Sequence, residues 1–105
     1  MLDEGVHSGD ASGVVPSSFR ILRYVLDRLE DSATGRLLPG QFHVEIPANR
    51  LAQAQATAAV LGDEVWKRQP WACGADGTPV LPMTADPVEA LLNRTWRPML
   101  SVTGV

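Results

Sequence analysis

The pattern of apolar and polar positions predicts a first helix that begins at Pro16 and runs to about Glu30. Proline suits the first position of a helix, where its missing N–H is not needed. Turn-forming residues follow at positions 31–35 and end the helix. The apolar residues of this segment recur at helical spacing, so we expect one buried stripe made of Phe19, Leu22, Val25, Leu26 and Leu29.

A second helix is predicted from Ala48 to Leu61, in a segment rich in alanine and glutamine. Gly62 stands where a glycine commonly ends a helix. A short helical turn over residues 63–68 is possible before the next proline.

A third, shorter helix is predicted to begin after Asp86 and to end around Asn93. Asp86 has the side chain of a helix cap, and Pro87 takes the first helical position. Glu89 stands where its side chain reaches back to the cap, as in a capping box.

The last residues, 95–105, alternate between two faces and predict a β-strand. Pro98 makes it an edge strand or moves its start beyond residue 98. A shorter alternation at residues 42–46 indicates a strand-like or extended segment. Because an isolated strand leaves backbone groups unpaired, we expect this chain to be a fragment of something larger. One face of the last segment carries Trp96, Pro98, Leu100 and Val102, and the other Met99, Ser101 and Thr103.

Composition narrows the class of protein. A length of 105 residues allows one domain. The net charge of −3 and a pI near 5.2 argue against a nucleic-acid-binding protein, which normally carries a basic patch. No apolar run approaches the ~18 residues of a membrane span. The first residues lack the layout of a signal peptide, and the single cysteine, Cys73, fits a reducing compartment, so we expect a cytoplasmic protein with no membrane partner.

His7 is the candidate functional residue, because it lies in a loop rich in glycine and serine just ahead of the first helix. Taken alone, a loop histidine is more often a surface or hydrogen-bonding residue. The only other histidine, His43, and the lone Cys73 form no cluster with metal-ligand spacing. We therefore expect no metal or cofactor site in this chain and a structural or exposed role for His43.

Several motifs together resemble the zinc-dependent dipeptidase and deacylase family, which includes carnosine dipeptidase, carboxypeptidase G, acetylornithine deacetylase and succinyl-diaminopimelate desuccinylase. The resemblance covers most of the chain and is strongest at residues 6–36 and 94–104. The matching stretches are Val6-His7-Ser8-Gly9, Val14-Val15-Pro16, the segment 29–36 and the segment 96–104.

The resemblance implies an α+β fold: residues 1–105 would form part of the lid, or dimerisation, domain, with helices packed on the remnant of an antiparallel sheet. Residues 41–85 would be an insertion specific to a subgroup. The parent enzyme would cleave dipeptides or N-acyl amino acid amides with two zinc ions or similar metals. Its metal ligands are absent here, so the fragment would be inactive alone, and its partners would be the rest of the catalytic domain and a second lid.

The same resemblance gives His7 a catalytic role in the parent enzyme. From the lid of one subunit it would reach the active site of the other and stabilise the oxyanion formed on the substrate. An N–H donor aimed at developing negative charge lowers a reaction barrier in this way.

Two other interpretations stay open at the level of sequence. The chain is alternatively a small, mostly helical interaction module without catalytic activity, which binds a protein partner through exposed apolar surface. The third possibility is an independent small enzyme that uses His7 or Cys73.

Overall fold

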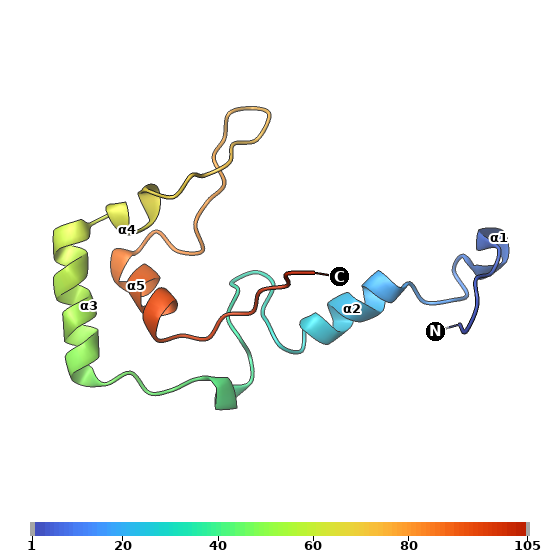
Figure 1. Cartoon of the computed structure of the whole chain (residues 1–105), viewed down its shortest axis with the longest axis horizontal. Helices are drawn as coiled ribbons and strands as arrows, with labels where there is room; N and C mark the ends of the chain where they lie inside the picture. Colours follow the sequence, from blue (N-terminus) through green and yellow to red (C-terminus); the bar gives the residue numbers. More distant parts are fainter. Residues whose placement is uncertain (1, 105) are drawn as a thin grey trace.

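The structure, a computed structural model, describes residues 2–104; Met1 and Val105 lie outside the described part. Helices dominate this part of the chain (Figure 1). They are α1 (Ser8–Ala11), α2 (Ser18–Leu26), the short 3₁₀ helix η1 (Gly40–Phe42), α3 (Ala48–Leu61), α4 (Glu64–Lys67) and α5 (Pro87–Thr95).

The predicted α+β fold is wrong. Across residues 2–104 there is no β-sheet, and the extended pairing consists of two isolated antiparallel bridges, Glu30 with Leu37 and Cys73 with Pro79. Each bridge closes a local turn rather than joining distant strands. The helices therefore do not pack on the remnant of an antiparallel sheet, and the lid architecture expected for residues 1–105 is not supported.

The predicted strand at residues 95–105 is also wrong in the described part, which stops short of Val105. Thr95 is the last residue of α5, and residues 98–104 have no regular secondary structure. Alternation favours a strand only where a neighbouring strand supplies hydrogen bonds. No such neighbour lies along this segment among residues 2–104, and Pro98 has no N–H to donate.

Helix α2 is shorter than the predicted helix and buries none of its residues. It begins at Ser18, after Ser17 in an extended conformation, rather than at Pro16. Beyond Leu26 the backbone continues as a tighter turn, in which the N–H of Leu29 donates to the carbonyl of Leu26. The apolar stripe exists, but it is not buried as predicted: Phe19 and Val25 are exposed, and Leu22, Leu26 and Leu29 are half-buried.

Helix α3 has the predicted bounds, Ala48–Leu61, and ends at Gly62 as expected. Gly62 adopts a φ of 53°, a left-handed conformation that glycine adopts without steric cost. Its N–H donates to the carbonyl of Ala58 and so satisfies one of the last carbonyl groups of the helix.

Helix α5 confirms the predicted cap but ends two residues later than expected. Asp86 Oδ1 accepts hydrogen bonds from the N–H groups of Val88 (2.8 Å) and Glu89 (3.2 Å). The Glu89 carboxylate does not return to the cap. It pairs instead with Arg97, beyond the end of the helix.

A small apolar cluster holds α3, α4 and α5 together. Ala58 of α3, Val65 of α4 and Leu91 of α5 are buried, and Val88 and Ala90 pack against them. Alanine-rich α3 lets α5 approach closely, because its side chains are small. Among residues 2–104, these three helices are the only ones that pack against one another.

Two tryptophans fasten the segment after α4 to this cluster. The indole N–H of Trp66 donates to the carbonyl of Ala85 at 3.1 Å, just before α5 begins. The indole N–H of Trp71 donates to the carbonyl of Trp66 at 2.8 Å, and the two rings meet edge to face. These tryptophans thus have a structural role.

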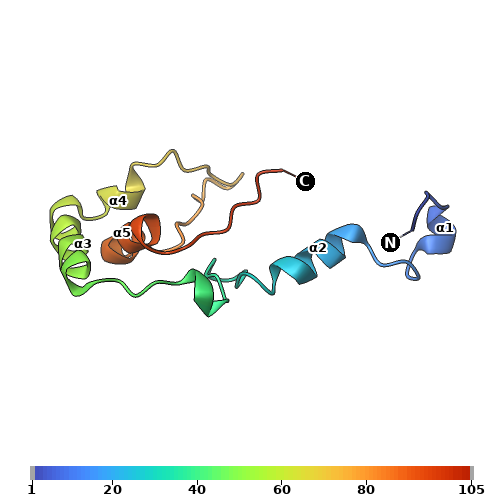
Figure 2. The same cartoon turned by 60° about the horizontal axis from the view of Figure 1, so that its bottom comes forward.

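The molecule is extended. Its radius of gyration is 19.6 Å, whereas a compact domain of this length has about 13 Å. In two views, α1 and α2 lie to one side of α3, α4 and α5 (Figures 1 and 2). No helix among residues 2–104 has both the length and the hydropathy that crossing a membrane requires.

The small cluster makes a clear stability prediction. Leu91→Ala should lower the free energy of unfolding of the α3–α5 unit by about 2–5 kcal/mol, because it removes buried methyl groups and leaves a cavity. Val60→Ala is the matched control, because Val60 of α3 is 85% exposed. Urea titration followed by far-ultraviolet circular dichroism measures both. Equal midpoints for the two variants would contradict the packing described here.

Candidate functional site

His7 stands at the start of α1, where it caps the helix. Its Nδ1 accepts a hydrogen bond from the N–H of Gly9 at 3.0 Å, and its carbonyl accepts from Asp10 and Ala11. Because Nδ1 is the acceptor, the proton of the neutral ring lies on Nε2. His7 is exposed, so this N–H is available to solvent.

Gly9 lies directly beside the His7 ring. A Cβ added at Gly9 would lie 2.9 Å from Nδ1 of His7, which is closer than carbon and nitrogen normally approach. A larger residue at position 9 would therefore displace the exposed His7 ring.

The structure does not bring His7 together with the other residues considered as reactive. His7 lies in the α1 segment, whereas His43 lies in the middle of the chain and Cys73 in the projecting loop between α4 and α5 (Figure 1). Cys73 is exposed. In the described part of the chain, no three residues of the types His, Cys, Asp and Glu are placed to hold a metal ion.

His43 has a structural contact that explains its position. A ring nitrogen, Nε2, lies 2.6 Å from the carbonyl oxygen of Leu37, so this nitrogen carries the proton and donates. Leu37 is itself buried, and its backbone bridges to Glu30. His43 thus ties the segment after η1 to the turn after α2, in agreement with the structural role expected for it.

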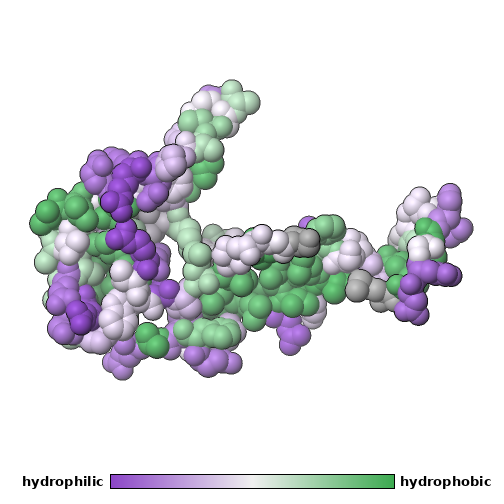
Figure 3. Space-filling view, viewed as in Figure 1, coloured by the Kyte–Doolittle hydropathy of each residue, from purple (hydrophilic) through white to green (hydrophobic). Residues whose placement is uncertain are grey.

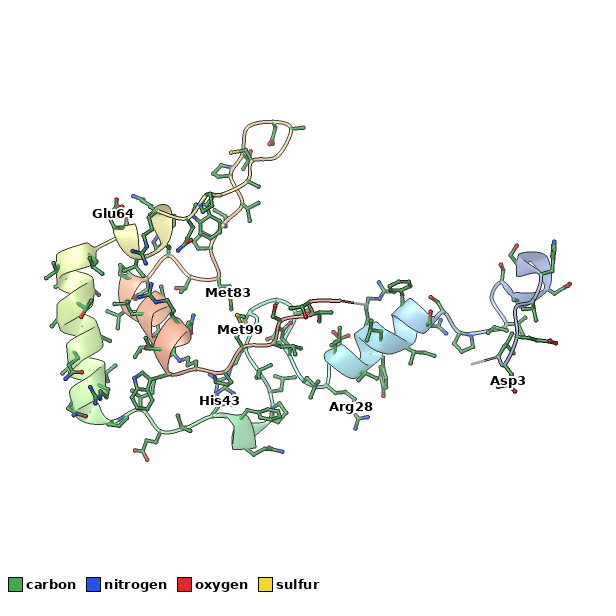
Figure 4. All side chains as sticks on the ribbon, in the orientation of Figure 1. Asp3, Arg28, His43, Glu64, Met83 and Met99 are labelled. Atoms are coloured by element: carbon green, nitrogen blue, oxygen red, sulfur yellow. The ribbon has the colours of Figure 1, made fainter. Side chains whose placement is uncertain are left out.

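A pocket of about 220 Å³ lies beside His43. Arg97 supplies its charge: Nη1 of Arg97 donates to Oε2 of Glu89 at 2.5 Å and to Oδ1 of Asn93 at 3.0 Å. Met83 and Met99 enter from two loops near His43 (Figure 4). The pocket is smaller than the ~300–1,000 Å³ typical of ligand sites, and its arginine is already paired.

Sequence reasoning missed this pocket, and no sequence signal marks it. Glu89 and Arg97 are eight positions apart, on a helix and beyond its end, so helical spacing does not connect them. The pocket forms because the folded backbone brings residues from separate segments together, and no single sequence motif contains them.

The two groups with shifted pKa values lie outside this pocket. The pKa of Lys67 is raised, first by its hydrogen bond to Asp63 and then by the charge of that carboxylate. The pKa of Asp76 is lowered by hydrogen bonds from Thr78, of which the backbone N–H lies 3.0 Å from Oδ1. Both are local pairs at the surface and indicate no acid–base chemistry.

Many large apolar side chains of this chain are exposed to solvent. The surface around α2 and the middle of the chain is broadly hydrophobic on the face shown in Figure 3. Val25 of α2 is 47% exposed and Phe19 is 65% exposed. Other exposed apolar side chains include Ile21, Leu38, Phe42 and Val44, together with Met99 and Val102 of the last segment.

No protein-family model matches the chain, and no curated protein matches it either. The resemblance to the zinc-dependent dipeptidase and deacylase family therefore stays a prediction from the sequence.

The scattered donor residues generate a prediction about metals. The purified chain should show no stoichiometric zinc site of micromolar or tighter affinity, because a zinc site requires three or more ligands that converge on one ion. Isothermal titration calorimetry with zinc checks this, with His7→Ala and Cys73→Ser as comparison variants. A one-to-one site that either substitution removes would contradict the expectation.

Proposed function

We propose that this chain is a protein-interaction chain whose fold is completed by a partner protein, and that it does not catalyse a reaction by itself. The supporting observation is its accessible surface of 8407 Å². A compact monomer of 11.3 kDa exposes about 5,700 Å². The chain therefore exposes about 2,700 Å² more surface than a self-contained domain of its mass would.

The size of this excess fits an obligate partner better than a transient one. Obligate complexes bury roughly 2,000–5,000 Å² in total, or about half of that from each chain. The excess is large enough to supply such an interface. It also has the right chemistry, because many of the exposed residues are apolar and the cores of obligate interfaces resemble domain interiors.

The partner would occupy the side of the molecule that contains α2. This helix packs against no other helix of the described chain, although its sequence places a continuous apolar stripe on one face. Contiguous apolar surface beyond a few hundred Å² normally marks an interaction site in a soluble protein. In contrast, the cluster of α3, α4 and α5 already buries its apolar residues against one another.

The net charge and the cysteine content support two further parts of the proposal: the partner is not a nucleic acid, and the complex lies in the cytoplasm. A net charge of −3 disfavours binding to nucleic acid, whose phosphates attract basic surfaces. The lone cysteine suits a reducing compartment, and we place the complex in the cytoplasm.

One local observation favours a second candidate function, a contribution by His7 to a metal-dependent peptidase or amidohydrolase. The Nε2–H of His7 is exposed and free to donate to an oxyanion, as the family resemblance implies. The metals, the substrate and a second lid would come from outside this chain. The sheet that this hypothesis expected is absent among residues 2–104, so its support is limited to the motifs and this one donor.

The interaction proposal predicts that a charge in the α2 stripe abolishes binding. Val25→Asp should weaken partner binding by about 100-fold, because an unpaired charge in an apolar interface is costly to desolvate. Tyr24→Asp is the matched control, since Tyr24 is the adjacent residue, lies off the stripe and is 69% exposed. Affinity capture from the native cell identifies the partner, and calorimetry on the purified components gives the affinities. Equal binding by both variants, or the absence of any bound protein including a second copy, would sink the proposal.

A further inference from the structure

We propose that the groove between α3 and α5 binds a small organic anion, one that joins a carboxylate or phosphate group to an apolar ring. The two helices lie side by side in both ribbon views (Figures 1 and 2) and pack against each other. The groove has a volume of about 490 Å³, which falls within the ~300–1,000 Å³ typical of ligand sites. It makes no use of α2, so this inference goes beyond the proposed interaction and does not depend on it.

One wall of the groove is a single face of α3. Arg50, Gln53, Ala54 and Thr57 line it, at the spacing of three and four residues that places side chains on the same side of a helix. Three of these four side chains are polar. This face of α3 therefore offers hydrogen-bonding groups beside the apolar contact that holds the two helices together.

The other wall is formed by the second half of α5 and the residue that follows it. Leu91, Arg94 and Thr95 line it with the same helical spacing, and Trp96 closes its end. Leu91 is also part of the buried cluster that fixes α5 against α3. The groove is therefore held open by the packing of the two helices and needs no ligand to form.

The floor of the groove is apolar and partly shielded from water. Leu91 is buried, and Ala54 and Trp96 are half-buried. An aromatic ring or another flat apolar group gains free energy when it covers such a floor. This floor accounts for the apolar part of the proposed ligand.

The charge of the groove is positive, although the chain as a whole carries a net charge of −3. Arg50 and Arg94 line it, and no aspartate or glutamate does. The two ion pairs among residues 2–104 involve Lys67 and Arg97 instead, so both groove arginines keep their charge uncompensated. Guanidinium groups bind carboxylates and phosphates through paired hydrogen bonds, which accounts for the anionic part of the ligand.

Arg50 stands where the stability of its own helix does not require a cation. It lies in the first turn of α3, next to the partial positive charge of the helix N-terminus. Its Nη1 donates to Oε1 of Gln53 at 3.0 Å, which orients the guanidinium and leaves its other N–H groups available. Arg94, in contrast, stands in the last turn of α5 and also favours the dipole of that helix.

Trp96 differs from the other two tryptophans of the chain. The indole N–H groups of Trp66 and Trp71 donate to backbone carbonyls. Within the described part of the chain, the indole N–H of Trp96 has no such acceptor, and it is not a buried group. A tryptophan that lines a groove and keeps a free N–H offers a ligand both a ring surface and a donor.

Phenyl phosphate is the test compound, because it joins a single ring to an anionic group. The purified full chain, labelled with nitrogen-15, is titrated to about 10 mM while the amide resonances are followed by nuclear magnetic resonance. Binding should be saturable with a Kd of about 1 mM or tighter, an affinity within reach of a ligand of this size. The shifted resonances should be those of groove residues such as Ala54, Thr57 and Thr95.

Two substitutions remove the charge of the groove, one from each wall. Arg50→Gln and Arg94→Gln should each raise the Kd by about fivefold or more, because each removes a charged hydrogen-bond donor. Arg68→Gln is the matched control, since Arg68 is exposed, follows α4 and lies outside the groove. It causes the same change in net charge and should alter the Kd by less than about twofold. All three arginines are exposed, so urea titration should show the same unfolding midpoint for each variant as for the wild type.

Inorganic phosphate and phenol separate the two parts of the ligand. Each should bind at least about tenfold more weakly than phenyl phosphate, because each contacts only the arginines or only the floor. Inorganic phosphate that binds as tightly as phenyl phosphate overturns the inference. Absence of saturable shifts, shifts centred on the pocket beside His43, or equal weakening by all three arginine substitutions also overturns it.

Discussion

The packing of α5 against α3 and α4 is the interaction on which the folded part of this molecule depends. Its centre consists of Ala58, Val65 and Leu91, each on a different helix. Residues outside this cluster are held mainly by local turns and by single hydrogen bonds such as that between His43 and Leu37. A core this small cannot cover the remaining apolar side chains. Helices α3, α4 and α5 therefore form a packed unit, whereas α1 and α2 pack against no other helix among residues 2–104.

The features that the sequence predicted correctly are those governed by neighbouring residues. Gly62 ends α3 because glycine accepts a positive φ, and Asp86 caps α5 because its carboxylate reaches the next free N–H groups. The strand at residues 95–105 failed for the opposite reason. Alternation shows which faces a segment would present, but a strand also needs a partner, and partners are set by the whole fold.

The candidate site was predictable only in part. The sequence placed His7 in a glycine-rich loop, and the structure shows it there, but as a helix cap with a nearby glycine. The pocket beside His43 depends on Glu89 and Arg97 meeting across the end of a helix, which spacing does not reveal. The stripe of α2 was predicted from its periodicity, yet its exposure was not, because periodicity reports a face and not what covers that face.

The exposed stripe links the folding of α2 to its binding. A helix of nine residues is marginal in water, because nucleation is costly and isolated helices shorter than about 12–15 residues gain too little from elongation. Arg23 in the last turn favours the helix dipole, but no acidic residue stands in the first turn to do the same. Packing of the stripe against another apolar surface would supply the stability that the isolated helix lacks. The formation of α2 and the covering of its stripe are therefore coupled, because each would stabilise the other.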